Sequence, residues 1–142
     1  MIEKEYFIPE ISDLRVGYEC EELLEQGWHT WKIHPNAFIS TYYKQKILEG
    51  KIRTHFLTRR QIEAEGWVFE KDAGYAMYTF SKEIDYPIPH WELSFNNEVH
   101  RITISSFISE ADTLKRHYEI KYSGGCSSIN EFRFICKLLN IK

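Results

Sequence analysis

The sequence predicts one α+β domain over residues 1–142, in which a mainly antiparallel, twisted sheet of about six to eight strands carries two or three short helices. Three observations predict this class. Residues 52–69 have the signals of a strand, a capped helix and a second strand. Residues 90–105 alternate like a β-hairpin, and residues 128–139 have the spacing of an amphipathic helix. A chain of this length buries enough surface to fold without disulfides or metals.

The helix expected after the strand Ile52–Leu57 has a signal at each end. Thr58 stands where an N-cap residue is needed, and Gln61 follows at the spacing of a capping box. Gly66 supplies the left-handed residue that ends many helices. A helix of about two turns is not stable alone in water, so we expect it to pack on the flanking strands.

Alternation and turn residues predict most of the remaining elements. Residues 35–50 are ambiguous, because a helical spacing competes with β-branched and aromatic content. We expect one hairpin from Val16–Leu24 and His29–His34, and a second from residues 90–95 and Val99–Ser105. Further strands are expected at Tyr75–Ser81 and His117–Tyr122. The segments expected outside regular strands are a loosely packed start at Met1–Asp13, a loop at Asp85–Pro89 and a polar connection at Ser106–Arg116.

The C-terminal helix is predicted from its cap and from its apolar stripe. Ser128 and Glu131 have the spacing of a capping box. The stripe consists of Ile129, Phe132, Ile135, Cys136 and Leu139, and Asn130, Arg133 and Lys137 are expected on the opposite face.

Composition excludes several classes of function. A net charge of −3 argues against general binding of duplex nucleic acid, which requires concentrated Lys and Arg. The cysteines Cys20, Cys126 and Cys136 are widely spaced and form no CxxC pair, as in a reducing cytoplasm. The N-terminus lacks the apolar core of a signal peptide, and no apolar run approaches the roughly 18 residues of a membrane span.

The best candidate for a binding site is the glycine-containing segment before the C-terminal helix. Two adjacent glycines between a strand and a helix start allow backbone N–H groups to converge on an anion or phosphate. The alternative is a tight turn followed by a helix cap. The candidate residues here are Ser123, Gly124, Gly125, Ser127 and Ser128.

A second candidate is the pair Arg59 and Arg60 at the start of the first capped helix. The helix dipole disfavours cations there, and residues that break a local rule sometimes mark a binding site. Guanidinium groups suit phosphate or an acidic partner. The alternative is an ion pair between Arg59 and Glu63, one turn further on.

Catalytic and metal signals are weak. Cys126 near a helix N-terminus, with His117 as a base, is the pattern of a small hydrolase or nuclease, but nothing in the sequence places the two together. The six histidines do not cluster in a recognised ligand pattern. We therefore expect no metal, no cofactor and no catalytic residue.

Three strings carry a resemblance to a known group: DLRVGYECE at Asp13–Glu21, IRTHFLTRRQIEAEGW at Ile52–Trp67 and SINEFRFICKLLNI at Ser128–Ile141. They resemble small uncharacterised proteins of phages and mobile elements of gut Bacteroidetes, which share a GYE strand, an IR-x-x-[YF]-L block and an NEF helix. Asn140 stands where the group usually has glycine. The shared motifs are structural, so no catalytic residue is carried over.

This resemblance implies a role in binding. Small accessory phage proteins often act on the host, and one such class sequesters cyclic-nucleotide immune signals as homo-oligomers. We therefore expect a non-enzymatic protein of the bacterial cytoplasm that binds a small nucleotide or a host protein. The alternatives are the Cys/His hydrolase or nuclease, and a structural or assembly protein whose aromatic residues form subunit contacts.

Overall fold

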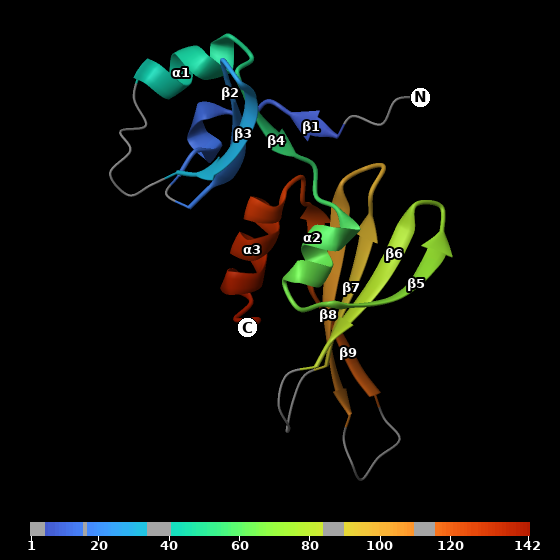
Figure 1. Cartoon of the computed structure of the whole chain (residues 1–142). Helices are drawn as coiled ribbons and strands as arrows, with labels where there is room; N and C mark the ends of the chain where they lie inside the picture. The colour runs from blue at the N-terminus through green and yellow to red at the C-terminus, as the bar shows by residue number, and fades with distance from the viewer. Residues whose placement is uncertain (1–4, 16, 34–40, 84–89, 110–115) are drawn as a thin grey trace. The chain divides into compact units, whose positions relative to one another are not determined.

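The computed structural model describes residues 5–15, 17–33, 41–83, 90–109 and 116–142. The chain divides into two compact units, Met1–Phe56 and Leu57–Lys142 (Figure 1). The antiparallel α+β class is confirmed. The described strands form two sheets where the sequence analysis expected one. Alternation shows which face of a strand is buried, but it does not show which strands are neighbours.

The first unit contains a four-stranded antiparallel sheet in the order β1-β4-β2-β3 within the described residues. The predicted hairpin is confirmed. The segment 35–50, which was ambiguous from its sequence, is helical over Thr41–Leu48, and residues 34–40 lie outside the description. The expectation of a loosely packed N-terminus is corrected, because β1 pairs with β4. The elements are β1 (Tyr6–Phe7), the 3-10 helix η1 (Ile11–Asp13), β2 (Glu19–Leu24), β3 (Gly27–Lys32), α1 (Thr41–Leu48) and β4 (Ile52–His55).

One face of this sheet is buried because β2 alternates. Cys20 is 3% exposed and Glu22 is 8% exposed, whereas Glu21 between them faces away. Glu22 is tolerated at this depth because its carboxylate pairs with Lys46 of α1 at 3.5 Å. The core consists of Leu14, Tyr18, Cys20, Ile33, Tyr43 and Ile52.

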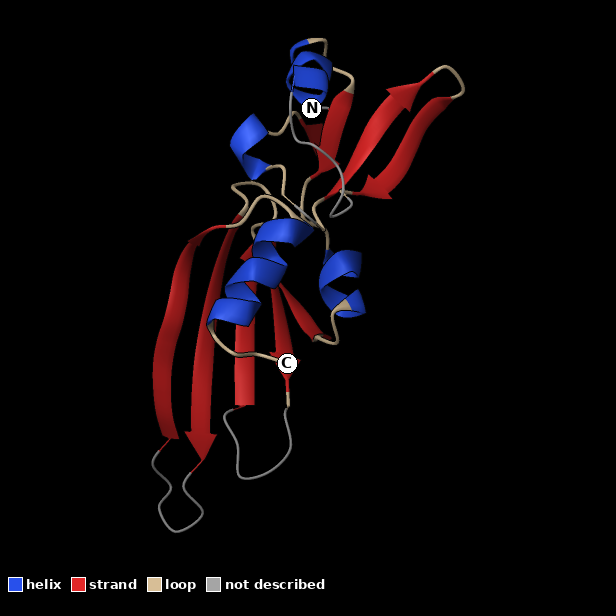
Figure 2. Cartoon of the chain, turned by 90° about the vertical axis from the view of Figure 1, so that its left-hand side faces the viewer, coloured by secondary structure: helices blue, strands red, loops and turns tan. Residues whose placement is uncertain are grey.

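The second unit is a five-stranded meander in the order β5-β6-β7-β8-β9, with α2 and α3 on one face (Figure 2). Its core lies between the sheet and these helices and includes Ile62, Phe80, Phe95 and Phe132. The elements are α2 (Arg59–Ala64), β5 (Val68–Gly74), β6 (Met77–Lys82), β7 (His90–Asn96), β8 (Arg101–Ser109), β9 (Arg116–Gly125) and α3 (Ile129–Leu138).

Two expectations about these strands are corrected, and a third falls outside the described residues. Tyr75 does not start a strand, because Tyr75 and Ala76 form the β5–β6 turn with φ of 52° and 58°. The polar connection expected at 106–116 is strand as far as Ser109 and again from Arg116, because cross-strand pairing overrides the low strand propensity of serine. The loop expected at Asp85–Pro89 lies outside the described residues.

The side chains of β9 do not all follow the predicted alternation. A register shift against Ile104 and Ser105 inserts one extra residue, Lys121. Tyr122 therefore packs against the core, whereas Ile120 is 58% exposed. A regular strand would place Tyr118, Ile120 and Tyr122 on one face, and the bulge separates the last from the other two.

The capping box of α2 is confirmed, whereas α3 has only the Ser128 half of the predicted box, because the Glu131 carboxylate accepts from the Ser127 N–H. The Gln61 N–H donates to Thr58 Oγ1 at 3.3 Å, and the Thr58 N–H donates to Gln61 Oε1 at 3.0 Å. Ser128 Oγ accepts the Glu131 N–H at 3.3 Å. Asn130 differs from expectation, because it is only 7% exposed.

Candidate functional site

The predicted glycine-containing segment is part of the folded sheet. Gly124 and Gly125 belong to β9 and pair with Ile102 and Arg101. A Cβ at Gly124 would lie 2.9 Å from Tyr122 Oη, which donates to the Gly125 carbonyl at 2.7 Å. The close approach of Tyr122 therefore explains why glycine is needed at position 124.

Two backbone donors in the segment expected to bind an anion are already used. The Ser127 N–H donates to Glu131 Oε2 at 2.8 Å, and the Cys126 N–H donates to the His100 carbonyl at 2.8 Å. Ser128 is 1% exposed. Ser123 Oγ lies 3.2 Å from Thr103 Oγ1. The Glu131 carboxylate thus accepts the hydrogen bond from the Ser127 N–H that an anionic ligand would otherwise accept.

The two arginines lie on α2 and do not share a pocket with the serine and glycine residues. Arg59 pairs with Glu63 at 3.3 Å, and its guanidinium carbon lies 3.4 Å from the centre of the Phe69 ring. Arg60 is exposed. The Leu57 N–H donates to the Ser127 carbonyl at 2.8 Å, which joins the segments that precede α2 and α3.

Cys126 lacks the environment of a reactive thiol. Its side chain is fully buried, and its sulfur donates to the Ser128 carbonyl at 3.7 Å. Burial, followed by the Glu131 carboxylate, raises the Cys126 pKa strongly, which disfavours the nucleophilic thiolate. The side chain of His117 lies outside the described part of the chain.

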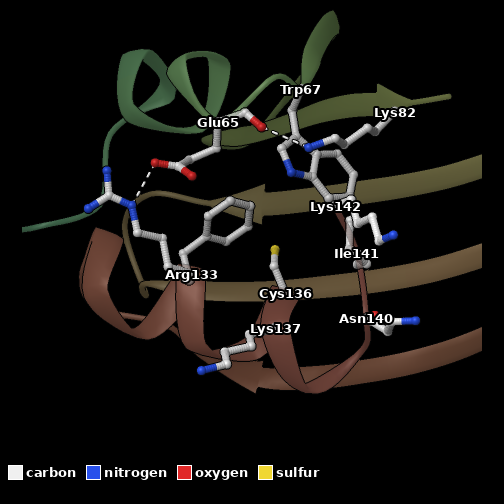
Figure 3. A pocket seen from close by; sticks show the side chains of 10 residues that line it. Glu65, Trp67, Lys82, Arg133, Cys136, Lys137, Asn140, Ile141 and Lys142 are labelled. Carbon is white, nitrogen blue, oxygen red and sulfur yellow. Dashed lines mark hydrogen bonds and ion pairs between the residues drawn. The ribbon is translucent and has the colours of Figure 1, made fainter. Parts of the chain in front are cut away.

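A pocket elsewhere in the second unit is the candidate functional site. It has a volume of about 330 Å³ and lies beside the C-terminal ends of α2 and α3 (Figure 3). We call it the cationic pocket. Its lining residues are Glu65, Trp67, Lys82, Phe132, Arg133, Cys136, Lys137, Asn140, Ile141 and Lys142.

Local structure at the end of α3 positions one side of the pocket. Asn140 adopts φ 57°, the left-handed conformation in which glycine, the usual residue here in the similar group, often ends a helix. The Ile141 N–H donates to the Cys136 carbonyl at 2.9 Å and the Asn140 N–H to the Lys137 carbonyl at 3.1 Å, which is the Schellman pattern. The turn buries Ile141 in the core, at 8% exposure.

Glu65 organises two of the cations. Its backbone carbonyl accepts from Lys82 Nζ at 2.8 Å, and its Oε1 accepts from Arg133 Nε at 2.6 Å, so that Glu65 lies between them (Figure 3). Lys137 and Lys142 form no ion pair with any carboxylate in the described ranges. The lining therefore has four cationic side chains and one carboxylate, in a chain whose net charge is −3.

The wall of the pocket is aromatic and apolar. Trp67 is 2% exposed and Phe132 is fully buried, with 6.0 Å between their ring centres. Lys82 Nζ lies 5.9 Å from the Trp67 ring centre. Trp67 Nε1 is buried without a hydrogen-bond acceptor among the described residues. Because both rings are buried, the accessible lining consists of the cationic side chains and the apolar atoms around them, which suits a ligand that has negative charge and an apolar group.

The pocket does not have the chemistry of a thiol enzyme. Burial raises the pKa of Cys136 to about 11, so its thiol is neutral near pH 7.

No group of three or more potential metal ligands occurs among the described residues. Within the same residues, no helix combines the length and apolarity needed to cross a membrane.

The residues of this site were not predicted from the sequence. Arg133 and Lys137 were expected on the polar face of the last helix, with no role in binding. Their spacing of four residues, followed by Lys142, was the available signal. None of the seven residues predicted to bind a ligand lines the pocket. Comparison with known proteins yielded no match to a family model, a curated protein or a solved structure.

Proposed function

We propose that this chain is a non-enzymatic binding protein whose cationic pocket holds a small anion with an aromatic part. One observation carries the proposal: an acidic chain, of net charge −3, gathers four cationic side chains beside Trp67 and Phe132 in one hollow. Phosphate would lie against the cations, and a base would lie on the apolar part of the lining, behind which Trp67 and Phe132 are buried. A nucleotide has both groups.

The volume narrows the ligand class. About 330 Å³ is near the lower end of the ~300–1,000 Å³ range of small-molecule sites. A ligand of one nucleotide unit suits this volume better than a larger one. We therefore favour a cyclic or linear mononucleotide.

The biological role is inferred from the resemblance to proteins of phages and mobile elements. Capture of a cyclic-nucleotide immune signal in the cytoplasm of a bacterial host fits both that origin and the chemistry of the pocket. A host protein with an acidic, aromatic segment is the alternative partner. Hydrolysis by Cys126 is less favoured, because its raised pKa keeps the thiol protonated.

Isothermal titration against cyclic mononucleotides, cyclic dinucleotides and uncharged nucleosides tests the proposal. We expect heat only with phosphate-bearing ligands, and an affinity that falls as salt screens the charges. Chromatography of the ligand afterwards should recover it unchanged. Absence of binding to every nucleotide in the panel would refute the proposed ligand class, and a hydrolysed ligand would refute the non-enzymatic role.

Charge reversal within the pocket provides a sharper test. Lys137→Glu should weaken nucleotide binding by roughly tenfold, equivalent to about 1.4 kcal/mol, because Lys137 is exposed and its replacement repels phosphate. Lys71→Glu on the exposed edge of β5 makes the same change in net charge outside the pocket and is the matched control. Equal losses in both variants would show that the pocket is not the site.

A further inference from the structure

The five-stranded sheet has two edges with different properties. The β5 edge is interrupted by two register shifts, at Phe69/Lys71 and at Asp72/Gly74, and Lys71 and Asp72 are exposed. Bulges and charged side chains protect an edge strand from pairing with another chain. The β9 edge is ten residues long and pairs only with β8 among the described residues. Its pairing with β8 has one register shift, at which Lys121 is the extra residue, against two along β5.

The β9 edge also exposes large side chains. Tyr118 is 56% exposed and Ile120 is 58% exposed. Tyr118 is held in place because its hydroxyl accepts from Ser105 Oγ at 2.7 Å. A long edge strand with exposed apolar groups is a template for the addition of another strand.

We propose that β9 pairs antiparallel with β9 of a second copy of this chain, about a two-fold axis at Ile120. In that register, Ile120 lies opposite Ile120 of the second copy. The bulge at Lys121 places Tyr122 on the core face of the sheet and leaves Tyr118 on the other face, so the tyrosines add no facing pair. Glu119 lies opposite Lys121 of the second copy, and Lys121 opposite Glu119 of the second copy. Opposite charges on facing residues stabilise strand pairing.

Charge favours this register over the symmetric registers whose axes lie one residue away. An axis at Glu119 places two carboxylates opposite each other, and an axis at Lys121 places two ammonium groups opposite each other. Parallel in-register pairing produces both repulsions at once. Within one chain, Lys121 Nζ already lies 2.7 Å from Glu119 Oε2, so both groups are on the same side of the strand. The dimer would therefore contain a cluster of four alternating charges.

Sedimentation equilibrium of the full chain tests the pairing. We expect a concentration-dependent dimer. Glu119→Lys and Lys121→Glu should each weaken it at least tenfold, because each places like charges opposite each other twice per dimer. The double variant Glu119→Lys/Lys121→Glu should restore dimerisation. Lys71→Glu on the other edge should leave it unchanged, and circular dichroism would confirm that every variant is folded.

Mixing the two single variants distinguishes this register from other modes of association. A Glu119→Lys chain opposes a Lys121→Glu chain with unlike charges at both positions, so the mixture should form a heterodimer although neither variant self-associates. A wild-type monomer at all accessible concentrations would overturn the proposal. So would dimers that persist in both single variants, or a mixture that remains monomeric.

Discussion

The two ends of α3 differ in whether their polar groups are already satisfied. At the N-terminal end, the helix dipole favours an anion, but the Glu131 carboxylate already accepts the Ser127 N–H. At the C-terminal end, Lys137 and Lys142 face the cationic pocket with no carboxylate partner in the described part of the chain. The dipole therefore indicates where an anion is favoured, but existing contacts decide whether a ligand can bind there.

The largest expected effect concerns the strand that leads into the N-terminal end. Gly124→Ala places a methyl group 2.9 Å from Tyr122 Oη, and this overpacking should lower the free energy of unfolding by about 1–3 kcal/mol. Tyr122→Phe removes the hydroxyl, so the double variant should lose less than the sum of the two single losses. Urea denaturation measures all three. Additive losses would show that the contact with Tyr122 Oη is not the reason why glycine is needed at position 124.

A smaller effect is expected from removing the carboxylate that accepts the Ser127 N–H at the N-terminal end of α3. Glu131→Ala frees the Ser127 N–H and should cost about 1 kcal/mol of stability. The freed donor lies at the start of a helix, where an anion can bind. Sulfate should therefore stabilise the variant more than it stabilises the wild type. Thermal unfolding with sulfate and with chloride at matched ionic strength measures the difference. Equal responses of the two proteins would show that the carboxylate does not close this end.

The smallest effect is expected at the C-terminal end. Asn140 adopts a left-handed conformation, φ 57°, which glycine adopts without steric cost. Asn140→Gly should therefore raise the free energy of unfolding by about 0.5 kcal/mol. Its side chain is exposed at the pocket, so nucleotide affinity should stay within about twofold, a difference below 0.5 kcal/mol. Urea denaturation and titration check both, and a loss of stability would contradict this account of the turn.

Local signals in the sequence account for much of the second unit. Thr58 and Gln61 predict the start of α2, because both partners of each cap hydrogen bond lie within one turn of helix. Trp91, Leu93 and Phe95 predict the buried face of β7 from alternation alone. The left-handed cap at Asn140 is also a local feature.

The candidate site was not predictable in the same way. Lys82 and Arg133 are brought together by Glu65, and the three belong to different elements. From the sequence, Gly124 and Gly125 were interpreted instead as a flexible anion-binding loop. A sequence does not show whether two adjacent glycines lie in a loop or in a strand. The structure distinguishes these cases through the pairing of Gly124 with Ile102 and through the position of Tyr122.

The sequence by itself determined the helix caps, the hairpins and the apolar faces of this protein, because those features depend on residues within a few positions of one another. Only the tertiary structure decided that the strands form two sheets, that Glu131 closes one end of α3, and that cations from β6 and α3 line one pocket. Those outcomes depend on contacts between residues far apart in the chain, for which a single sequence carries no local signal.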